Sequence, residues 1–230
     1  MTYQELLQLI RTPRAPVAFT RENTALLLID MQKLALAEDL VASAVAHGVD
    51  EALATELCSG YQKRCDAVNA NCARLLEAFR QRDMTPIHVR VQSYAGDARD
   101  TGPAHRRVGY IIPPGNYWGE WIEEAEPLPG EIVLCKTCSG AVIGTNLDKV
   151  LRNMNIRYVV ALGYYTDQCV ETTVRDLHDL GYDVTLVTDC TACPTEERYQ
   201  ASMMTCGGVY CRKATTDEVL AELAGIEITQ

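Results

Sequence analysis

The stretch "RYVVALGYYTDQCVETTVRDLHDLGYDVTLVT", residues 157–188, decides the fold. It opens with an apolar run over 157–163, which is typical of a strand buried on both faces. A helical pattern over 168–181 follows and ends at a glycine, a common helix stop. A second apolar run then covers 182–188. A strand, a helix and a strand in this order predict a parallel sheet with helices packed on it.

The same alternation continues along most of the chain. Further short apolar runs, each typical of a buried strand, lie at residues 24–30, 86–91, 131–135 and 207–211. Helical patterns lie between them, over 51–82 and 144–156. Near-continuous apolar strands separated by helices predict an α/β fold in which helices cover both faces of a parallel sheet.

The longest predicted helix, residues 51–82, carries an apolar stripe that includes three cysteines. The stripe recurs in steps of three and four residues and consists of Cys58, Tyr61, Cys65, Val68, Cys72, Leu75 and Phe79. Its cysteines could form a thiol cluster, or they could face the core. We favour the core, because a free cysteine behaves as a small hydrophobic side chain.

Length and charge narrow the class of protein. A chain of 230 residues can form one well-buried domain, so we expect a single domain over 1–230 with an N-terminal arm at 1–23. The formal net charge is −10 and the basic residues are scattered. This balance argues against nucleic acid or a membrane as a partner and leaves a small-molecule substrate.

The cysteines are expected to be thiols. The N-terminus shows no secretory signal and no apolar run is long enough to span a bilayer, so we expect a cytoplasmic protein. Ten cysteines in a reducing compartment are thiols rather than a disulfide framework. Two C-x-x-C pairs, 135–138 and 190–193, could hold zinc or act as redox pairs. Because the pairs lie far apart and each follows a strand, we expect no metal site.

Residues 93–130 differ from the rest of the chain. They contain many proline and glycine turns and few periodic apolar residues, which is typical of a functional loop. We expect this stretch to cover a pocket as a lid, with three aromatic walls and two candidate carboxylate or carbonyl anchors, namely Tyr117, Trp118, Trp121, Arg106 and Arg107. The alternative is a surface loop or a subunit contact.

Three chemically active residues stand at predicted strand ends. Asp30 closes one strand, Lys136 closes another, and Cys169 opens the helix after a third. Parallel strands bind ligands beyond their carboxyl ends, so the three side chains are expected to meet. The helix start and Lys136 are expected to lower the pKa of the Cys169 thiol. Each residue also has an ordinary structural interpretation when it is considered alone. The Asp could cap a turn, the Lys could face solvent, and the Cys could pack in the core.

Three motifs together resemble the isochorismatase-like cysteine hydrolases over about residues 22–212. They are "ALLLIDMQ", "KTCSGAVIGTNL" and "GYYTDQCVETTVRDLHDLGYDVTLVTDC", in the order and separation of that family. The resemblance implies a three-layer α/β/α, Rossmann-like fold with a six-stranded parallel sheet. It also implies a catalytic triad of Asp30, Lys136 and Cys169, with Cys169 as the nucleophile.

The resemblance carries further expectations about the site. It implies a cis peptide bond between Tyr164 and Tyr165, and an oxyanion hole formed by the backbone N–H groups of Tyr165 and Cys169. Tyr164 is expected to contribute to substrate binding. No cofactor and no metal are expected, and the protein is expected to be a homo-oligomer, either a dimer or a tetramer.

The family contains several activities, and the residues favour one of them. True isochorismatases cleave a vinyl ether and have glycine in place of the cysteine, so Cys169 favours hydrolysis of an amide C–N bond, with release of ammonia. Nicotinamidases bind a metal through an Asp-x-His motif and a second histidine. The histidines here, at 47, 88, 105 and 178, do not match that pattern. The alternatives are a vinyl-ether hydrolase and a catalytically degenerate binding protein.

Within the amidohydrolases, the chain most resembles the enzymes that act on ureido and carbamoyl compounds, including biuret hydrolases. Three departures leave the substrate open. The segment after Asp30 is alanine-rich and helical in pattern, and Tyr165 is bulky where the family usually has a small residue. Cys206 also precedes Gly207, where the biuret-like members tend to have glutamine.

Overall fold

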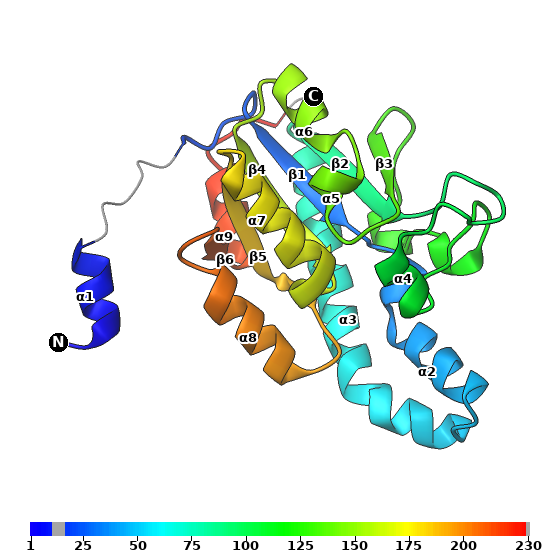
Figure 1. Cartoon of the computed structure of the whole chain (residues 1–230). Coiled ribbons are helices and arrows are strands. Elements are labelled where there is room, and N and C mark those ends of the chain that lie inside the picture. The colour runs from blue at the N-terminus through cyan, green and yellow to red at the C-terminus, as the bar shows by residue number, and fades with distance from the viewer. Residues whose placement is uncertain (11–16, 229–230) are drawn as a thin grey trace.

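The computed structural model describes residues 1–10 and 17–228. Its centre is a six-stranded, wholly parallel sheet in the order β3-β2-β1-β4-β5-β6. The strands are β1 (Thr24–Ile29), β2 (Thr85–Val91), β3 (Ile132–Lys136), β4 (Tyr158–Tyr164), β5 (Asp183–Ala192) and β6 (Arg212–Ala214). Figure 1 shows this sheet between helices on both faces. The predicted three-layer fold is therefore confirmed.

The helices that cover the sheet divide between its two faces (Figure 1). One face packs against α3 (Glu51–Arg80) and α9 (Thr216–Leu223). The other packs against α6 (Leu147–Asn153), α7 (Glu171–Asp179) and α8 (Glu196–Cys206). Four further helices lie outside these layers or beside them, namely α1 (Tyr3–Ile10), α2 (Ala37–Ala46), α4 (Pro103–Arg107) and α5 (Ala141–Gly144).

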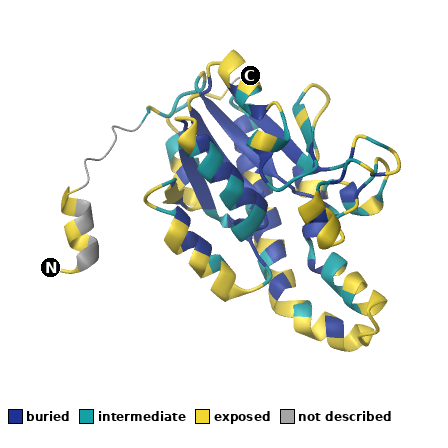
Figure 2. Ribbon diagram, viewed as in Figure 1, coloured by how far each residue is buried: buried dark blue, intermediate teal, exposed yellow. Residues whose placement is uncertain are grey.

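The central strand β1 shows why both faces are buried. Alternate side chains of a strand point to opposite faces, so Leu26 and Leu28 join the core under α3. Leu27 and Ile29 join the core under α6 and α7. Figure 2 shows the strands and the inner sides of the helices as buried and the outer sides as exposed. Fully burying a Leu or Ile side chain stabilises the fold by about 1.5–3 kcal/mol.

The cysteine stripe of α3 faces the core. Cys65 and Cys72 are fully buried and belong to the core cluster under α3, and Cys58 packs against that cluster from the edge. Apolar spacing therefore predicted the buried side of α3 correctly. Among the described thiols, those that touch one another are Cys206 and Cys211, whose Sγ atoms lie 3.7 Å apart.

Four predicted elements have different bounds in the structure. The predicted strand 182–188 is β5, which continues to Ala192, so Cys190 lies within the strand and does not follow it. The run 207–211 is a turn, and the edge strand is β6, because Gly208 adopts a φ of +83° and Tyr210 N–H bonds back to Cys206. The predicted helix 144–156 is replaced by α5 and α6, separated by an extended residue. The predicted helix 168–181 begins as a π-type turn, η4 (Thr166–Val170), and continues as α7.

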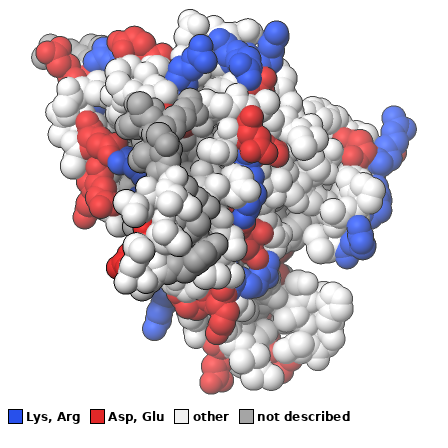
Figure 3. Space-filling view, turned by 60° about the vertical axis from the view of Figure 1, so that its left-hand side comes forward, with Lys and Arg blue, Asp and Glu red and all other residues white. Residues whose placement is uncertain are grey.

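The irregular stretch 93–130 contains α4 and two short 3₁₀ turns, η2 (Tyr117–Gly119) and η3 (Glu123–Ala125). The predicted arm 1–23 begins with α1, and its residues 11–16 lie outside the described part of the chain. None of the described helices has both the length and the hydrophobicity of a membrane span. On the face shown in Figure 3, acidic and basic side chains are scattered among uncharged ones.

The strand order places a ligand-binding edge beside β1. The chain runs outward from β1 to β2 and β3, and then returns to β4 on the other side of β1. At such a switch point, parallel sheets bind ligands beyond the carboxyl ends of the strands. Gly163 at the end of β4 has a φ of +126°, and a Cβ atom there would lie 1.9 Å from the Ile29 carbonyl oxygen. Only glycine lets β4 approach β1 this closely.

Candidate active site

Asp30, Lys136 and Cys169 meet at this edge of the sheet. The Lys136 Nζ lies 2.8 Å from Asp30 Oδ2 and donates a hydrogen bond of 3.3 Å to Cys169 Sγ. A third hydrogen bond, of 3.1 Å, runs from Lys136 Nζ to the Cys138 carbonyl. Lys136 is 0% exposed and the other two are nearly as buried. Lys136 thus contacts both of the other residues of the triad predicted from the sequence.

Three different elements hold these side chains. Asp30 follows β1 and adopts a left-handed φ of 52°. Lys136 is the last residue of β3, and Cys169 lies in η4 directly after β4. Cys169 is anchored below by its carbonyl, which accepts a 2.6 Å hydrogen bond from Thr173 Oγ1. The parallel sheet therefore fixes the thiol, the ammonium and the carboxylate from separate strands.

The charge state of the thiol differs from the sequence expectation. Burial raises the pKa of Cys169 to about 12, and the negative charge of Asp30 adds to the effect. Lys136 lowers this pKa, but less than burial and Asp30 raise it. The expectation of a lowered thiol pKa was wrong, because a thiolate at this position would lose nearly all of its hydration. Burial therefore favours the neutral thiol as the resting group.

Asp30 is placed to accept the thiol proton. Burial raises the pKa of its carboxyl group, and the ammonium group of Lys136 opposes that rise. Lys136 itself has a pKa raised to about 12, because attraction to Asp30 and Cys169 outweighs its own burial, so it stays protonated. Asp30 Oδ1 is buried and accepts no hydrogen bond from the described residues. A free lone pair and a raised pKa are what a general base requires.

We expect alkylation of Cys169 by iodoacetamide to be slow at neutral pH and to accelerate steeply as the pH rises. The reason is that the thiolate reacts and burial keeps its fraction small. The rate can be followed by mass spectrometry on the tryptic peptide 158–175, in which Cys169 is the only cysteine. Asp30→Asn removes a negative charge and should shift this profile to lower pH. Fast alkylation at neutral pH would contradict the assignment of a thiol resting state.

The peptide bond between Tyr164 and Tyr165 is cis. It joins the end of β4 to η4, directly before the turn that carries Cys169. Within the described chain, the backbone N–H of Tyr165 donates no hydrogen bond to another residue. A backbone donor without a partner beside a buried thiol is suited to bind an oxygen atom of a ligand.

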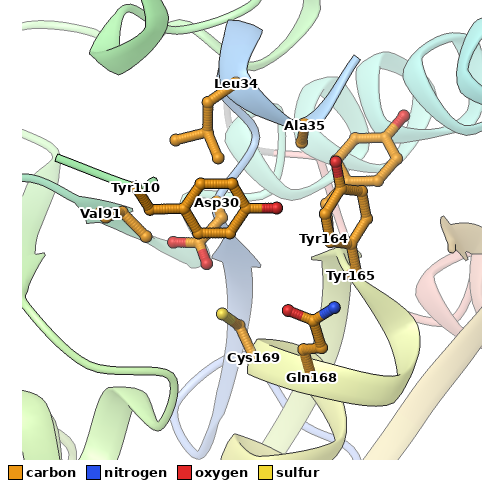
Figure 4. Close-up of a pocket in the computed structure, with 9 residues that line it drawn as sticks. All are labelled: Asp30, Leu34, Ala35, Val91, Tyr110, Tyr164, Tyr165, Gln168 and Cys169. Atoms are coloured by element: carbon orange, nitrogen blue, oxygen red, sulfur yellow. The ribbon is translucent and has the colours of Figure 1, made fainter. Parts of the chain in front are cut away.

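A small cavity opens above the thiol (Figure 4). It measures about 10 Å³, which is close to the space needed by one water molecule. Its lining consists of Asp30, Leu34, Ala35, Val91, Tyr110, Tyr164, Tyr165, Gln168 and Cys169. Figure 4 shows Asp30, Tyr110, Gln168 and Cys169 around one common space. A substrate larger than water needs some of these side chains to move.

Sequence reasoning missed several lining residues. Leu34 and Ala35 follow Asp30 in a short 3₁₀ turn, η1 (Lys33–Ala35), and Val91 ends β2. Val91 and Gln168 could have been found, because one closes a predicted strand and the other precedes Cys169. Tyr110 carries no such signal, since it comes from the irregular stretch 93–130.

The predicted aromatic walls lie elsewhere. Trp118 packs on the cluster of Leu34, Val91 and Ile112 and so supports the cavity wall from behind. Trp121 packs against His88, with ring centres 5.6 Å apart, and under the Arg90 guanidinium, near the β3 edge of the sheet. Tyr117 is exposed and donates a hydrogen bond to Glu38. None of these three residues lines the described cavity.

Arg106, Arg107 and Tyr164 were also predicted to contact the substrate. Arg106 donates hydrogen bonds to the carbonyls of Ala98 and Arg99, and Arg107 is exposed. Neither of these two arginines lines the described cavity. Tyr164 does line it, but its hydroxyl donates to Asn69 Oδ1 at 2.8 Å. The Tyr164 ring therefore belongs to the core, and only part of the residue faces the cavity.

Among the described residues, no group of three or more His, Cys, Asp or Glu side chains could hold a metal ion. The C-x-x-C thiols make separate contacts: Cys190 with Thr216, Cys193 with the Thr195 carbonyl, Cys135 with Arg90 and Cys138 with the Gly140 carbonyl. Each pair is used in local packing.

Known proteins resemble this chain in sequence and in structure. The uncharacterized isochorismatase family protein YrdC of Bacillus subtilis is 30% identical over 53% of this chain, and the chain spans 59% of that relative's length. Ureidoacrylate amidohydrolase RutB of Variovorax paradoxus is 29% identical over 76% of this chain and 71% of its own. The crystal structure of N-carbamoylsarcosine amidase from Thermoplasma acidophilum covers 85% of this chain and 97% of its own, with 25% identity and a TM-score of 0.60.

The family assignment rests on a match that covers most of the chain. The family model of the isochorismatase domain matches residues 24–217. That range begins at β1 and ends in α9, so it includes all six strands of the sheet and all three residues of the buried cluster. The chain belongs to the isochorismatase family.

Proposed function

We propose that this protein is a cysteine amidohydrolase that cleaves the C–N bond of a small amide, ureido or carbamoyl compound and releases ammonia. The observation that carries the proposal is the contact of Lys136 Nζ with both Asp30 Oδ2, at 2.8 Å, and Cys169 Sγ, at 3.3 Å. This contact puts a nucleophile, a base and a fixed positive charge in one buried site. The names of two relatives, an amidohydrolase and an amidase, support the same chemistry.

The first half of the reaction forms a thioacyl enzyme. Asp30 accepts the proton of Cys169 as Sγ attacks the carbonyl carbon of the substrate. Lys136 stabilises the developing negative charge on sulfur, and the N–H groups of Tyr165 and Cys169 stabilise the charge on the carbonyl oxygen. Asp30 then gives its proton to the leaving nitrogen, so the C–N bond breaks and ammonia departs.

The second half regenerates the enzyme. A water molecule donates a proton to Asp30 and its oxygen attacks the thioacyl carbon. When the tetrahedral intermediate collapses, the C–S bond breaks and the proton returns from Asp30 to Cys169. Lys136 remains protonated throughout, which its raised pKa of about 12 favours. One water is consumed for each ammonia released.

The raised thiol pKa supports this proton path. Burial raises the pKa of the Cys169 thiol to about 12, which favours removal of the proton as the sulfur attacks. Asp30, whose pKa is raised by burial, is the base in contact with the cluster. We therefore expect kcat/KM to fall as acid protonates Asp30, with a midpoint above the usual pKa of about 3.9 for aspartate.

The proposal is tested by ammonia release from a panel of primary amides, ureido acids and carbamoyl compounds. We expect at least one class to be hydrolysed by the native protein and none by Cys169→Ser. Cys135→Ser is a matched control, because Cys135 lies on β3 outside the cluster. Hydrolysis of a vinyl ether without ammonia release, or activity that survives in Cys169→Ser, would contradict the proposal.

A further inference from the structure

We infer that this site selects substrates without a negative charge and rejects ureido or carbamoyl acids that carry a free carboxylate. The inference rests on the proposed amidohydrolase function and adds the charge of the substrate to it. By analogy, the name of the relative ureidoacrylate amidohydrolase would instead suggest a substrate with a carboxylate. It also departs from our sequence-based expectation that Arg106 or Arg107 anchors a carboxylate.

The lining of the cavity holds one carboxylate, which is paired with Lys136, and no cationic side chain. Among its nine residues, Asp30 is the carboxylate and no lysine, arginine or histidine is present. The other polar groups are the three phenols of Tyr110, Tyr164 and Tyr165 and the carboxamide of Gln168, all of them neutral. The Gln168 carboxamide bonds to no other described residue, and Figure 4 shows it facing the space beside Cys169. These groups can bind N–H and C=O groups but cannot neutralise a carboxylate.

The nearest cation is already committed. Lys136 Nζ has three partners, namely Asp30 Oδ2, Cys169 Sγ and the Cys138 carbonyl, which matches the three donors of an ammonium group. It cannot bind a substrate carboxylate without leaving the buried Asp30 unpaired, a loss that costs several kcal/mol. The positive charge of Lys136 therefore stabilises Asp30 and Cys169 and does not bind a substrate carboxylate.

Two cations on segments that flank the cavity, Lys33 and Arg198, are paired as well. Lys33, beside Leu34, lies 2.6 Å from Glu120 and over the ring of Tyr117. Arg198 is paired at 2.6 Å with Asp167, next to Gln168. Each pair is close to neutral, so neither supplies the isolated positive charge that would attract an anionic substrate.

Asp39 adds a second negative charge near the same phenols. It lies in the first turn of α2, is half-buried, and forms no hydrogen bond or ion pair through its side chain with the described residues. Its charge contributes, after burial, to the raised pKa of both Tyr110 and Tyr165. Burial raises the pKa of Asp39 to about 6, which leaves it ionised at neutral pH. A substrate carboxylate would therefore find the unpaired carboxylate of Asp39 nearby and no free cation in the cavity lining.

The inference is tested with pairs of compounds in which a carboxylate is replaced by an uncharged ester or amide. Suitable pairs are ureidoacrylate and its methyl ester, and N-carbamoylglycine and its methyl ester, because ammonia can come only from the ureido group in each. Malonamate and malonamide form a third pair for primary amides. We expect kcat/KM to favour the uncharged member by about 10-fold or more, the scale of a like-charge contact in a buried site.

Two variants on one helix locate the source of the selectivity. Asp39→Asn should reduce the preference for the uncharged compound several-fold. Glu38→Gln removes the same charge one residue away, from a side chain that bonds to Tyr117, and should leave the preference unchanged. Equal preferences in Asp39→Asn and Glu38→Gln would overturn the role assigned to Asp39.

The outcomes separate the two proposals. If the anionic members are hydrolysed as fast as the uncharged ones, the inference fails while the amidohydrolase function stands. If Arg107→Gln abolishes turnover of the anionic members alone, an arginine anchor operates and the inference is overturned. If no compound releases ammonia, the proposed function fails and this inference fails with it.

Discussion

Replacing Cys169 with serine is expected to lower kcat by about 10⁴-fold or more, because the nucleophile of the first step is lost. The change is nearly isosteric, so the fold should survive. The serine hydroxyl would be harder to ionise than the thiol, and the buried site already opposes ionisation of the group at position 169.

The measurement is steady-state ammonia release together with thermal unfolding. Cys135→Ser is the control, since it replaces a thiol on β3 that touches Arg90 instead of the cluster. We expect that control to retain activity. A Cys169→Ser protein that keeps more than about a tenth of the native kcat would show that Cys169 is not the nucleophile.

The second large effect is expected from Lys136→Met, which should abolish activity and also destabilise the fold by about 3–5 kcal/mol. Lys136 is 0% exposed and contacts Asp30 at 2.8 Å. Removing it leaves the Asp30 carboxylate buried without its counter-ion. The free energy of unfolding can be measured by urea denaturation.

The double variant Asp30→Asn with Lys136→Met separates stability from catalysis. It removes both charges, so we expect most of the lost stability to return while activity stays absent. Asparagine suits position 30 because it tolerates the left-handed φ of 52° there. Lys33→Met, at an exposed ion pair, is the control and should change little. A double variant as unstable as the sum of its singles, or one that is active, would contradict the coupled triad.

The sequence predicted the fold because its signals are local. The buried strands β1, β2 and β4 are continuous apolar runs, and their predicted bounds differ from the observed ones by about one residue. β6 escaped prediction because it has three residues, two of them exposed, and so leaves no apolar run. Parallel topology then places strand ends at one edge, which is why Asp30, Lys136 and Cys169 could be expected to meet.

The details of the site depend on burial and on loop geometry, which are not local. The thiol pKa was predicted in the wrong direction, since the sequence shows Lys136 but not the loss of hydration that outweighs it. Tyr110 reaches the cavity while Trp121 packs near the β3 edge of the sheet, although both come from the same irregular stretch. No periodic pattern in residues 93–130 distinguishes these two aromatic residues.

The most direct test of the central claim is to trap the thioacyl enzyme. The native protein is mixed with a hydrolysed substrate, quenched in acid within its first turnover, and digested with trypsin. We predict that the peptide 158–175, which has Cys169 as its only cysteine, gains the mass of the acyl group, and that hydroxylamine removes it. An acyl group found on another cysteine while the peptide 158–175 stays unmodified would contradict the account.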